Sequence, residues 1–127
     1  MKKVYFACAL AYSTQEYRDE VANLKDLLRK HFEIGDFYGF IPTADPKIIF
    51  EHDINQVQNC DMVIAECSYP STGMGIEIGT ALALNKPVIA IAKNDLEVSA
   101  MITGNSKIPL IRYHDTQEIL EALKVYI

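Results

Sequence analysis

The chain has 127 residues, of which 50% are hydrophobic and 23% charged, and its formal net charge at pH 7 is −5. This length predicts one domain over residues 1–127, and the apolar fraction with seven tyrosines and five phenylalanines argues against disorder. The negative charge disfavours general binding to nucleic-acid polymers or anionic membranes, and no apolar run predicts a membrane span or a signal peptide.

The first half of the chain predicts two strands and two helices. Val4–Cys8 is a β-branched and aromatic run that predicts a strand. Ser13–Glu16 has the pattern of a capping box, a serine followed three residues later by a glutamate, and predicts a helix that runs to about His31. Residues 34–40 fit a short strand interrupted by two glycines. After a loop with two prolines, a second helix is expected from Pro46 or Lys47 to Asn59.

The next segments predict a pair of buried strands around a helix. Met62–Ala65 is apolar without alternation, as parallel strands are. A loop at 67–73 leads to a helix over 75–84, which ends at Asn85-Lys86-Pro87. Val88–Ala92 is another continuous apolar run and predicts the next strand.

The C-terminal segments complete the alternation. A short helix is expected over 96–103, closed by Gly104, and Leu110–Tyr113 predicts the last strand. Asp115 is a good N-cap for a final helix with apolar residues at helical spacing. The alternation predicts a doubly wound, flavodoxin- or Rossmann-like α/β fold with a five-stranded, mainly parallel sheet and helices on both faces.

Ligands of such folds bind beyond the carboxyl ends of the strands, which directs attention to residues 7–13, 66–75 and 92–99. Ser71–Gly79 follows a strand and opens a helix, where exposed amides favour an anion and glycines such as Gly73 and Gly75 allow close approach of a ligand. The glycine spacing fits neither a dinucleotide-binding fingerprint nor a Walker A loop.

Glu77 falls in the first turns of that helix, where the helix dipole stabilises a carboxylate by up to about 1 kcal/mol. An acid that stays ionised suits a nucleophile. Asp53, on the helix before the second buried strand, could share the chemistry by binding or protonating a leaving group. From the residues alone, both also fit solvated helix acids, and Tyr5 in the first strand fits a core residue.

The cysteines Cys8, Cys60 and Cys67 form no CxxC pair and do not cluster with the histidines. A zinc site or a disulfide framework is therefore disfavoured, and free thiols in a reducing cytoplasm are expected. Cys8 and Cys67 fall near strand ends, which makes either a candidate reactive thiol, although free cysteines more often fill the core.

Three runs of sequence, 51–66, 70–79 and 83–88, resemble the nucleoside 2-deoxyribosyltransferase superfamily. The resemblance is strongest to its 2′-deoxynucleoside 5′-phosphate N-hydrolase branch and covers nearly the whole chain apart from 33–47. It implies an enzyme that acts on an N-glycosidic bond without a metal or organic cofactor. It also implies a homodimer or a dimer of dimers, to which the tyrosine-containing loops at 37–40 and 69 would add interface or lid surface.

The resemblance also implies roles for single residues. Glu77 matches the family nucleophile that attacks C1′ of the sugar, Asp53 the aspartate that contacts the base, and Tyr5 the tyrosine that orients the glutamate. Ser71 matches the serine that holds the 5′-phosphate in the hydrolase branch, where nucleoside transferases usually have aspartate. Ser99 matches a serine that reaches the phosphate in the neighbouring subunit's site.

The chain departs from the hydrolase branch after its first strand. The branch has a Gly-Ser-Ile-Arg-Gly-Gly type loop there, whereas this chain has Cys-Ala-Leu-Ala-Tyr-Ser at 8–13. We expect phosphate binding to be weaker, or to be supplied by Ser13, Lys93 or backbone amides. The expected reaction is hydrolysis of a (2′-deoxy)nucleoside 5′-monophosphate. Base exchange between deoxynucleosides is the alternative within the class, and a nucleotide-binding module without turnover is the alternative outside it.

Overall fold

The computed structural model describes residues 1–11, 13–35 and 45–126 of the chain. Its sheet contains five strands, which all pair in parallel in the order β2-β1-β3-β4-β5. They are β1 (Lys3–Cys8), β2 (Glu33–Ile34), β3 (Met62–Glu66), β4 (Val88–Lys93) and β5 (Leu110–Tyr113). This order is that of flavodoxin-like folds, and it confirms the predicted fold class.

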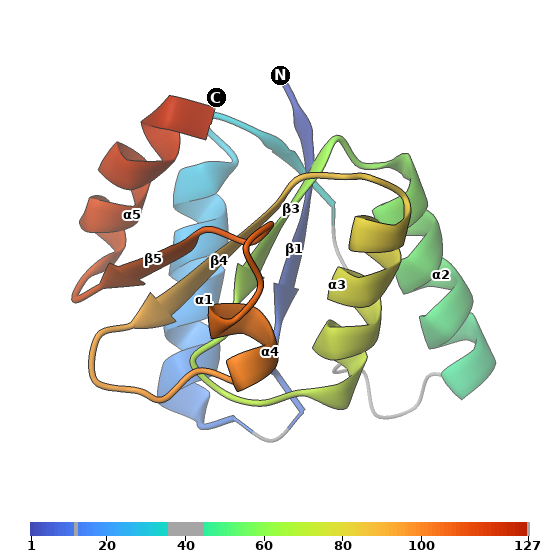
Figure 1. The fold of residues 1–127 in the computed structure, drawn as a ribbon, viewed down its shortest axis with the longest axis horizontal. Helices are drawn as coiled ribbons and strands as arrows, with labels where there is room; N and C mark the ends of the chain where they lie inside the picture. Colours follow the sequence, from blue (N-terminus) through green and yellow to red (C-terminus); the bar gives the residue numbers. More distant parts are fainter. Residues whose placement is uncertain (12, 36–44, 127) are drawn as a thin grey trace.

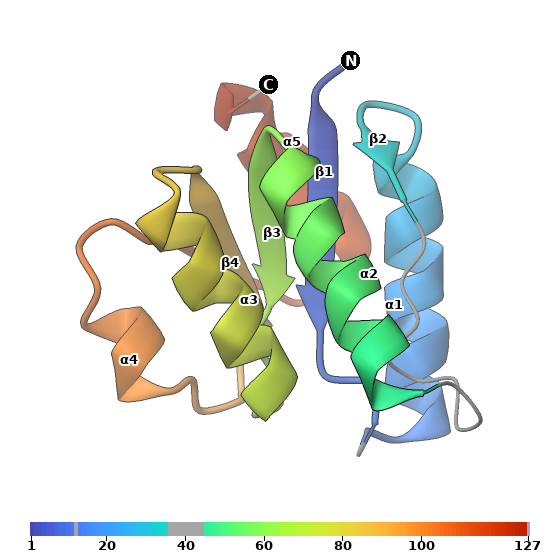
Figure 2. The same ribbon diagram turned by 90° about the vertical axis from the view of Figure 1, so that its right-hand side faces the viewer.

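Helices cover both faces of the sheet (Figures 1 and 2). On one face lie α1 (Gln15–Leu28) and α5 (Thr116–Leu123), which is followed by a 3₁₀ turn at Lys124–Tyr126. On the other lie α2 (Pro46–Asn59), α3 (Thr72–Ala83) and the short α4 (Ala100–Thr103). None of the described helices is both long and apolar enough to cross a membrane.

Side chains of β1 alternate between two apolar clusters, one on each face of the sheet. Val4 and Phe6 pack with α1 and α5, whereas Tyr5 and Ala7 belong to the cluster formed with α2 and α3. Because successive strand residues point to opposite faces, this register places the Tyr5 side chain on the side of α2 and α3.

Two helices begin at other residues than the sequence pattern predicts. The N-cap of α1 is Thr14, whose side chain accepts a hydrogen bond from the backbone N–H of Tyr17 at 3.1 Å. Ser13 is not the cap, because its hydroxyl donates to the carbonyl of Leu10. The first residue of α3 is Thr72 rather than Gly75, because Ser71 caps the helix by accepting from the backbone N–H of Met74 at 3.2 Å.

The other boundaries differ less. The N-cap Ser99 starts α4 at Ala100, so this helix is shorter than the predicted 96–103. In α1 the last helical residue is Leu28, and the chain to His31 continues as turns. Of the predicted strand at 34–40, the structure describes only the pairing of Glu33–Ile34 with β1, and 36–44 lie outside the described residues.

Candidate active site

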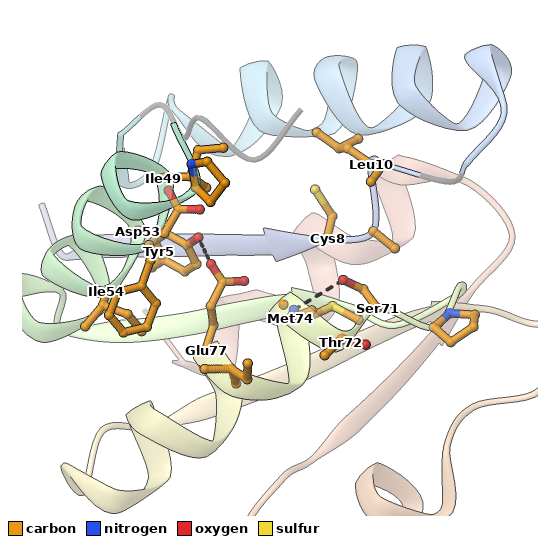
Figure 3. Close-up of a pocket in the computed structure, with 17 residues that line it drawn as sticks. Tyr5, Cys8, Leu10, Ile49, Asp53, Ile54, Ser71, Thr72, Met74 and Glu77 are labelled. Atoms are coloured by element: carbon orange, nitrogen blue, oxygen red, sulfur yellow. Dashed lines mark hydrogen bonds between the residues drawn. The ribbon is translucent and has the colours of Figure 1, made fainter. Parts of the chain in front are cut away.

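A pocket of about 610 Å³ lies at the carboxyl end of β1, where the strand order changes direction (Figure 3). Its walls come from β1 and the loop that follows it, from α2, and from the first turns of α3 with the loop before them. Two of the three predicted segments, 7–13 and 66–75, contribute lining residues, whereas 92–99 contributes none among the described residues.

Three of the predicted site residues meet in this pocket from three different elements. Tyr5 comes from β1, Asp53 from α2 and Glu77 from α3, and their polar groups point toward one another in Figure 3. The Tyr5 hydroxyl donates a hydrogen bond to Oε2 of Glu77. Asp53 is only 9% exposed, so its carboxylate lies within the pocket wall and is not a solvated helix acid.

Burial sets the ionisation of Glu77. The pKa of Glu77 is raised to about 7, because burial raises it more than the hydrogen bond from Tyr5 lowers it, and the negative charge of Asp53 adds to the rise. Burial and the charge of Glu77 also raise the pKa of Tyr5, so the phenol keeps its proton and acts as a donor. The net shift therefore opposes the ionisation that the helix dipole was expected to favour. Glu77 is the sixth residue of α3, beyond the first turn in which the dipole acts most strongly.

The anion-binding expectations for the start of α3 hold only in part. Ser71 and Gly73 line the pocket, together with Thr72. Gly75 does not line it, and a Cβ built at Gly75 meets nothing within 4 Å. Neither glycine adopts a positive φ, so the backbone conformation of this segment does not require glycine.

The predicted phosphate donors elsewhere do not line the pocket. Lys93 pairs with Glu20 on α1 at 2.6 Å, and the Ser13 hydroxyl bonds the Leu10 carbonyl. Ser99 is exposed at the start of α4, where its side chain accepts from the backbone N–H of Met101. Among the described lining residues none is a lysine, arginine or histidine.

All three cysteines are buried and free. Burial raises the pKa of Cys8 and of Cys67 to about 12, so neither is a thiolate at neutral pH. The suggestion that one of them is reactive is wrong, although Cys8 does form part of the pocket wall. No group of three or more His, Cys, Asp or Glu within 1–11, 13–35 and 45–126 is arranged to hold a metal ion.

Sequence reasoning missed the apolar wall of the pocket. Four hydrophobic residues of α2 and α3 form this wall: Ile49, Phe50, Ile54 and Ile76. Phe50 is 57% exposed and Ile76 51% exposed, so a ligand in the pocket could cover apolar surface on both side chains. A flat aromatic base could pack on this wall.

Sequence reasoning also missed a buried carboxylate, that of Glu66 at the end of β3. Glu66 is fully buried and accepts hydrogen bonds from the Tyr17 hydroxyl at 3.2 Å, from the Ser68 backbone N–H at 2.6 Å, from the Ser68 hydroxyl at 3.0 Å, and from the Tyr113 hydroxyl. The only hint in the sequence is an acid at the end of an otherwise apolar strand. Through Ser68, this residue fixes the loop that leads to Ser71.

Comparison with known proteins gives a consistent result. A sequence model of the nucleoside 2-deoxyribosyltransferase family matches residues 4–110. A Thermofilum pendens protein named "Putative 2′-deoxynucleoside 5′-phosphate N-hydrolase 1" is 38% identical over 95% of this chain and 92% of its own length. The 5-hydroxymethyl-dUMP N-hydrolase of Tetraodon nigroviridis is 29% identical over 96% of this chain and 94% of its own. The structure of a CMP N-glycosidase from Clostridium botulinum superposes with a TM-score of 0.72, at 26% identity, over 98% of this chain and all of the other.

Proposed function

Because this chain belongs to the nucleoside 2-deoxyribosyltransferase family, we propose that it hydrolyses the N-glycosidic bond of (2′-deoxy)nucleoside 5′-monophosphates, with Glu77 as the nucleophile. The observation that carries this proposal is the Tyr5–Glu77 hydrogen bond beside Asp53 in one pocket. A pocket of about 610 Å³ is large enough for a nucleotide. The relatives are named for the same type of reaction, which supports the substrate class.

The mechanism follows from the positions of three side chains. Tyr5 holds Oε2 of Glu77, so Oε1 is the oxygen that attacks C1′ of the sugar. As the Glu77–C1′ bond forms, the C1′–N bond breaks, and its electron pair leaves with the base, which takes a proton from Asp53 or from water. Water then attacks C1′ and gives a proton to the Asp53 carboxylate or to solvent, the bond between C1′ and Glu77 breaks with its electron pair left on the Glu77 carboxylate, and the sugar 5-phosphate is released.

The phosphate would be bound by neutral donors at the start of α3. Ser71 uses an oxygen lone pair to cap the helix, which leaves its hydroxyl proton free to be donated to a ligand. Thr72 and Gly73 lie beside it in the pocket wall. The backbone N–H groups of Thr72 and Gly73, in the first turn of α3, would donate to the same phosphate, as helix N-termini do for anions.

Two alternatives make different demands on the site. Base exchange between deoxynucleosides would use the same Glu77 intermediate, resolved by a second base in place of water. A nucleotide-binding module without turnover would need only the start of α3. The meeting of Tyr5, Asp53 and Glu77 supports an enzyme over such a module, because binding alone does not require a hydrogen-bonded acid beside a second carboxylate.

Glu77→Ala should lower the rate of base release by at least about 1,000-fold, because the nucleophile is lost. The fold should persist, since a single partly exposed helix acid contributes little stability. The assay incubates the protein with nucleosides and 5′-monophosphates and measures the released base by chromatography. A slow substrate should also leave a pentosyl phosphate adduct on the peptide that contains Glu77, detectable by mass spectrometry.

The matched control is Glu118→Ala, which removes an exposed acid on α5, on the face of the sheet opposite to α2 and α3, and should retain full turnover. Base release by Glu77→Ala at the wild-type rate would overturn the mechanism. If base is released from deoxynucleosides only when an acceptor base is present, the protein is a transferase and not a hydrolase.

A further inference from the structure

His52 contacts Asp53 from a position outside the pocket lining. The two residues are neighbours on α2, and Nδ1 of His52 lies 3.0 Å from Oδ1 of Asp53. The Asp53 side chain is 12% exposed and the His52 side chain 26% exposed. Asp53 therefore lines the pocket, and its Oδ1 is hydrogen-bonded to the His52 imidazole, which is partly exposed to solvent.

We infer that His52 is a positioning residue for Asp53, and that it stabilises the charge that appears on Asp53 when its proton passes to the departing base. The inference rests on the proposed function, in which Asp53 assists the leaving base. His52 itself does not touch the substrate and exchanges no proton in this step.

The direction of this hydrogen bond depends on the tautomer of His52. In the proposed step Oδ1 of Asp53 carries no proton and can only accept, so we place the hydrogen on Nδ1 of His52, which donates it to Oδ1. Oδ2 is then the oxygen that carries the proton for the base. When the C1′–N bond breaks, its electron pair passes to the base, the proton moves from Oδ2 to the base, and Asp53 is left as a carboxylate bonded to the His52 N–H.

The surroundings of Asp53 explain why such a donor matters. Across the pocket, Asp53 faces Glu77 and Tyr5, and the Tyr5 hydroxyl is already bonded to Glu77. The lining residues next to Asp53 on α2, Ile49 and Ile54, are apolar. A hydrogen bond to a charged group is stronger than one between neutral groups, and it is strongest where the group is shielded from water.

The experiment compares His52→Leu, which removes the donor, with His52→Asn, whose side-chain amide offers an N–H near the position of Nδ1. With a nucleoside monophosphate that the wild type cleaves, His52→Leu should lower kcat by roughly 10- to 100-fold, the value of a hydrogen bond to a charged group, and change KM little. His52→Asn should recover most of that loss. His31→Leu, at an exposed histidine beyond the end of α1, should behave as the wild type.

A second readout separates positioning from a general effect on the fold. The loss should shrink to a few-fold when the base leaves without needing a proton, as in 7-methyl-dGMP compared with dGMP, or 5-fluoro-dUMP compared with dUMP. Equal losses for both members of a pair, or wild-type turnover of His52→Leu, would overturn the inference. If the wild type releases no base from any monophosphate, the proposed function fails instead, and the two failures are thus distinguished.

Discussion

The ionisation of Glu77 depends on two neighbours that act in opposite directions. Tyr5 donates a hydrogen bond that favours the carboxylate, whereas the charge of Asp53 disfavours it, and burial brings the pKa of Glu77 to about 7. A nucleophile must be ionised to attack. The acidic limb of the pH profile of kcat/KM should therefore rise with pH up to about 7.

Substitutions of Tyr5 and Asp53 should shift the acidic limb of the pH profile of kcat/KM in opposite directions. Tyr5→Phe removes the donor and should shift the limb to higher pH, while Asp53→Asn removes the negative charge and should shift it to lower pH. The measurement is kcat/KM for one monophosphate between pH 5 and 9, on enzymes that remain folded over that range. Both variants will be slower than the wild type, but only the position of the limb tests the assignment. Shifts of the two variants in the same direction would show that another group titrates.

In α3, Ser71 caps the helix and, in the proposed site, binds the phosphate. One substitution tests these two roles separately. Ser71→Asp should preserve the cap of α3, since aspartate caps helices as well as serine does, so stability should change by less than about 0.5 kcal/mol. It also adds a third carboxylate to a pocket without a lysine, arginine or histidine among its described lining residues, and this should repel a phosphate dianion by roughly 1 to several kcal/mol. Cleavage of monophosphates should fall, whereas cleavage of free nucleosides should stay or rise.

Ser71→Asn supplies the control, because asparagine also caps the helix but brings no charge. The ratio of kcat/KM for dCMP and deoxycytidine, or for the preferred base, measures the effect. An unchanged ratio in Ser71→Asp would exclude Ser71 from the phosphate end of the pocket.

The end of β3 depends on Glu66 for its geometry. Glu66→Gln replaces an acceptor oxygen by an NH₂ group that faces hydroxyl and amide donors, and it should lower the free energy of unfolding by about 2–4 kcal/mol. Tyr113→Phe removes only one of the donors and should cost about 1–1.5 kcal/mol. Urea unfolding of both variants and of the wild type checks this order. A Glu66→Gln protein as stable as the wild type would show that the network contributes nothing.

The sequence was most informative where patterns are local. The apolar runs at 62–65 and 88–92 predicted β3 and β4, because a strand buried on both faces needs continuous hydrophobicity. Cap positions were less predictable, since Ser13 and Thr14 are both good caps, and the Ser13 hydroxyl bonds the Leu10 carbonyl while Thr14 caps the helix. The pairing of Tyr5 with Glu77 joins residues 72 positions apart, so no local pattern predicts it, and only the family resemblance implied it. No sequence pattern showed that burial would outweigh the helix dipole at Glu77.

For the molecule as a whole, the site of a single chain lacks a strong partner for a phosphate. Among the described lining residues there is no basic side chain, and the loop after β1 contributes Ala9, Leu10 and Ala11. At the same time α4 leaves Met101 81% exposed next to Ser99, whose hydroxyl is used only to cap that short helix. The exposed side chain of Met101 is suited to a protein–protein interface, and the Ser99 hydroxyl could donate a hydrogen bond to a ligand bound by another subunit. We therefore propose a homodimer or dimer of dimers in which Ser99 reaches the phosphate of the neighbouring site.

Mixing two damaged proteins tests this assembly. Ser99→Asp keeps the cap of α4 but should repel the phosphate, while Glu77→Ala has no nucleophile. In a mixed dimer, one site combines both defects, and the other combines an intact Glu77 with an intact Ser99. Random exchange of subunits should therefore restore about a quarter of the wild-type activity, because about half of the dimers are mixed and each has one intact site. The measurement is base release from a monophosphate after the two proteins have exchanged subunits, with light scattering to establish the mass. A fully active monomer at the assay concentration, or a mixture no more active than its components, would refute the shared site.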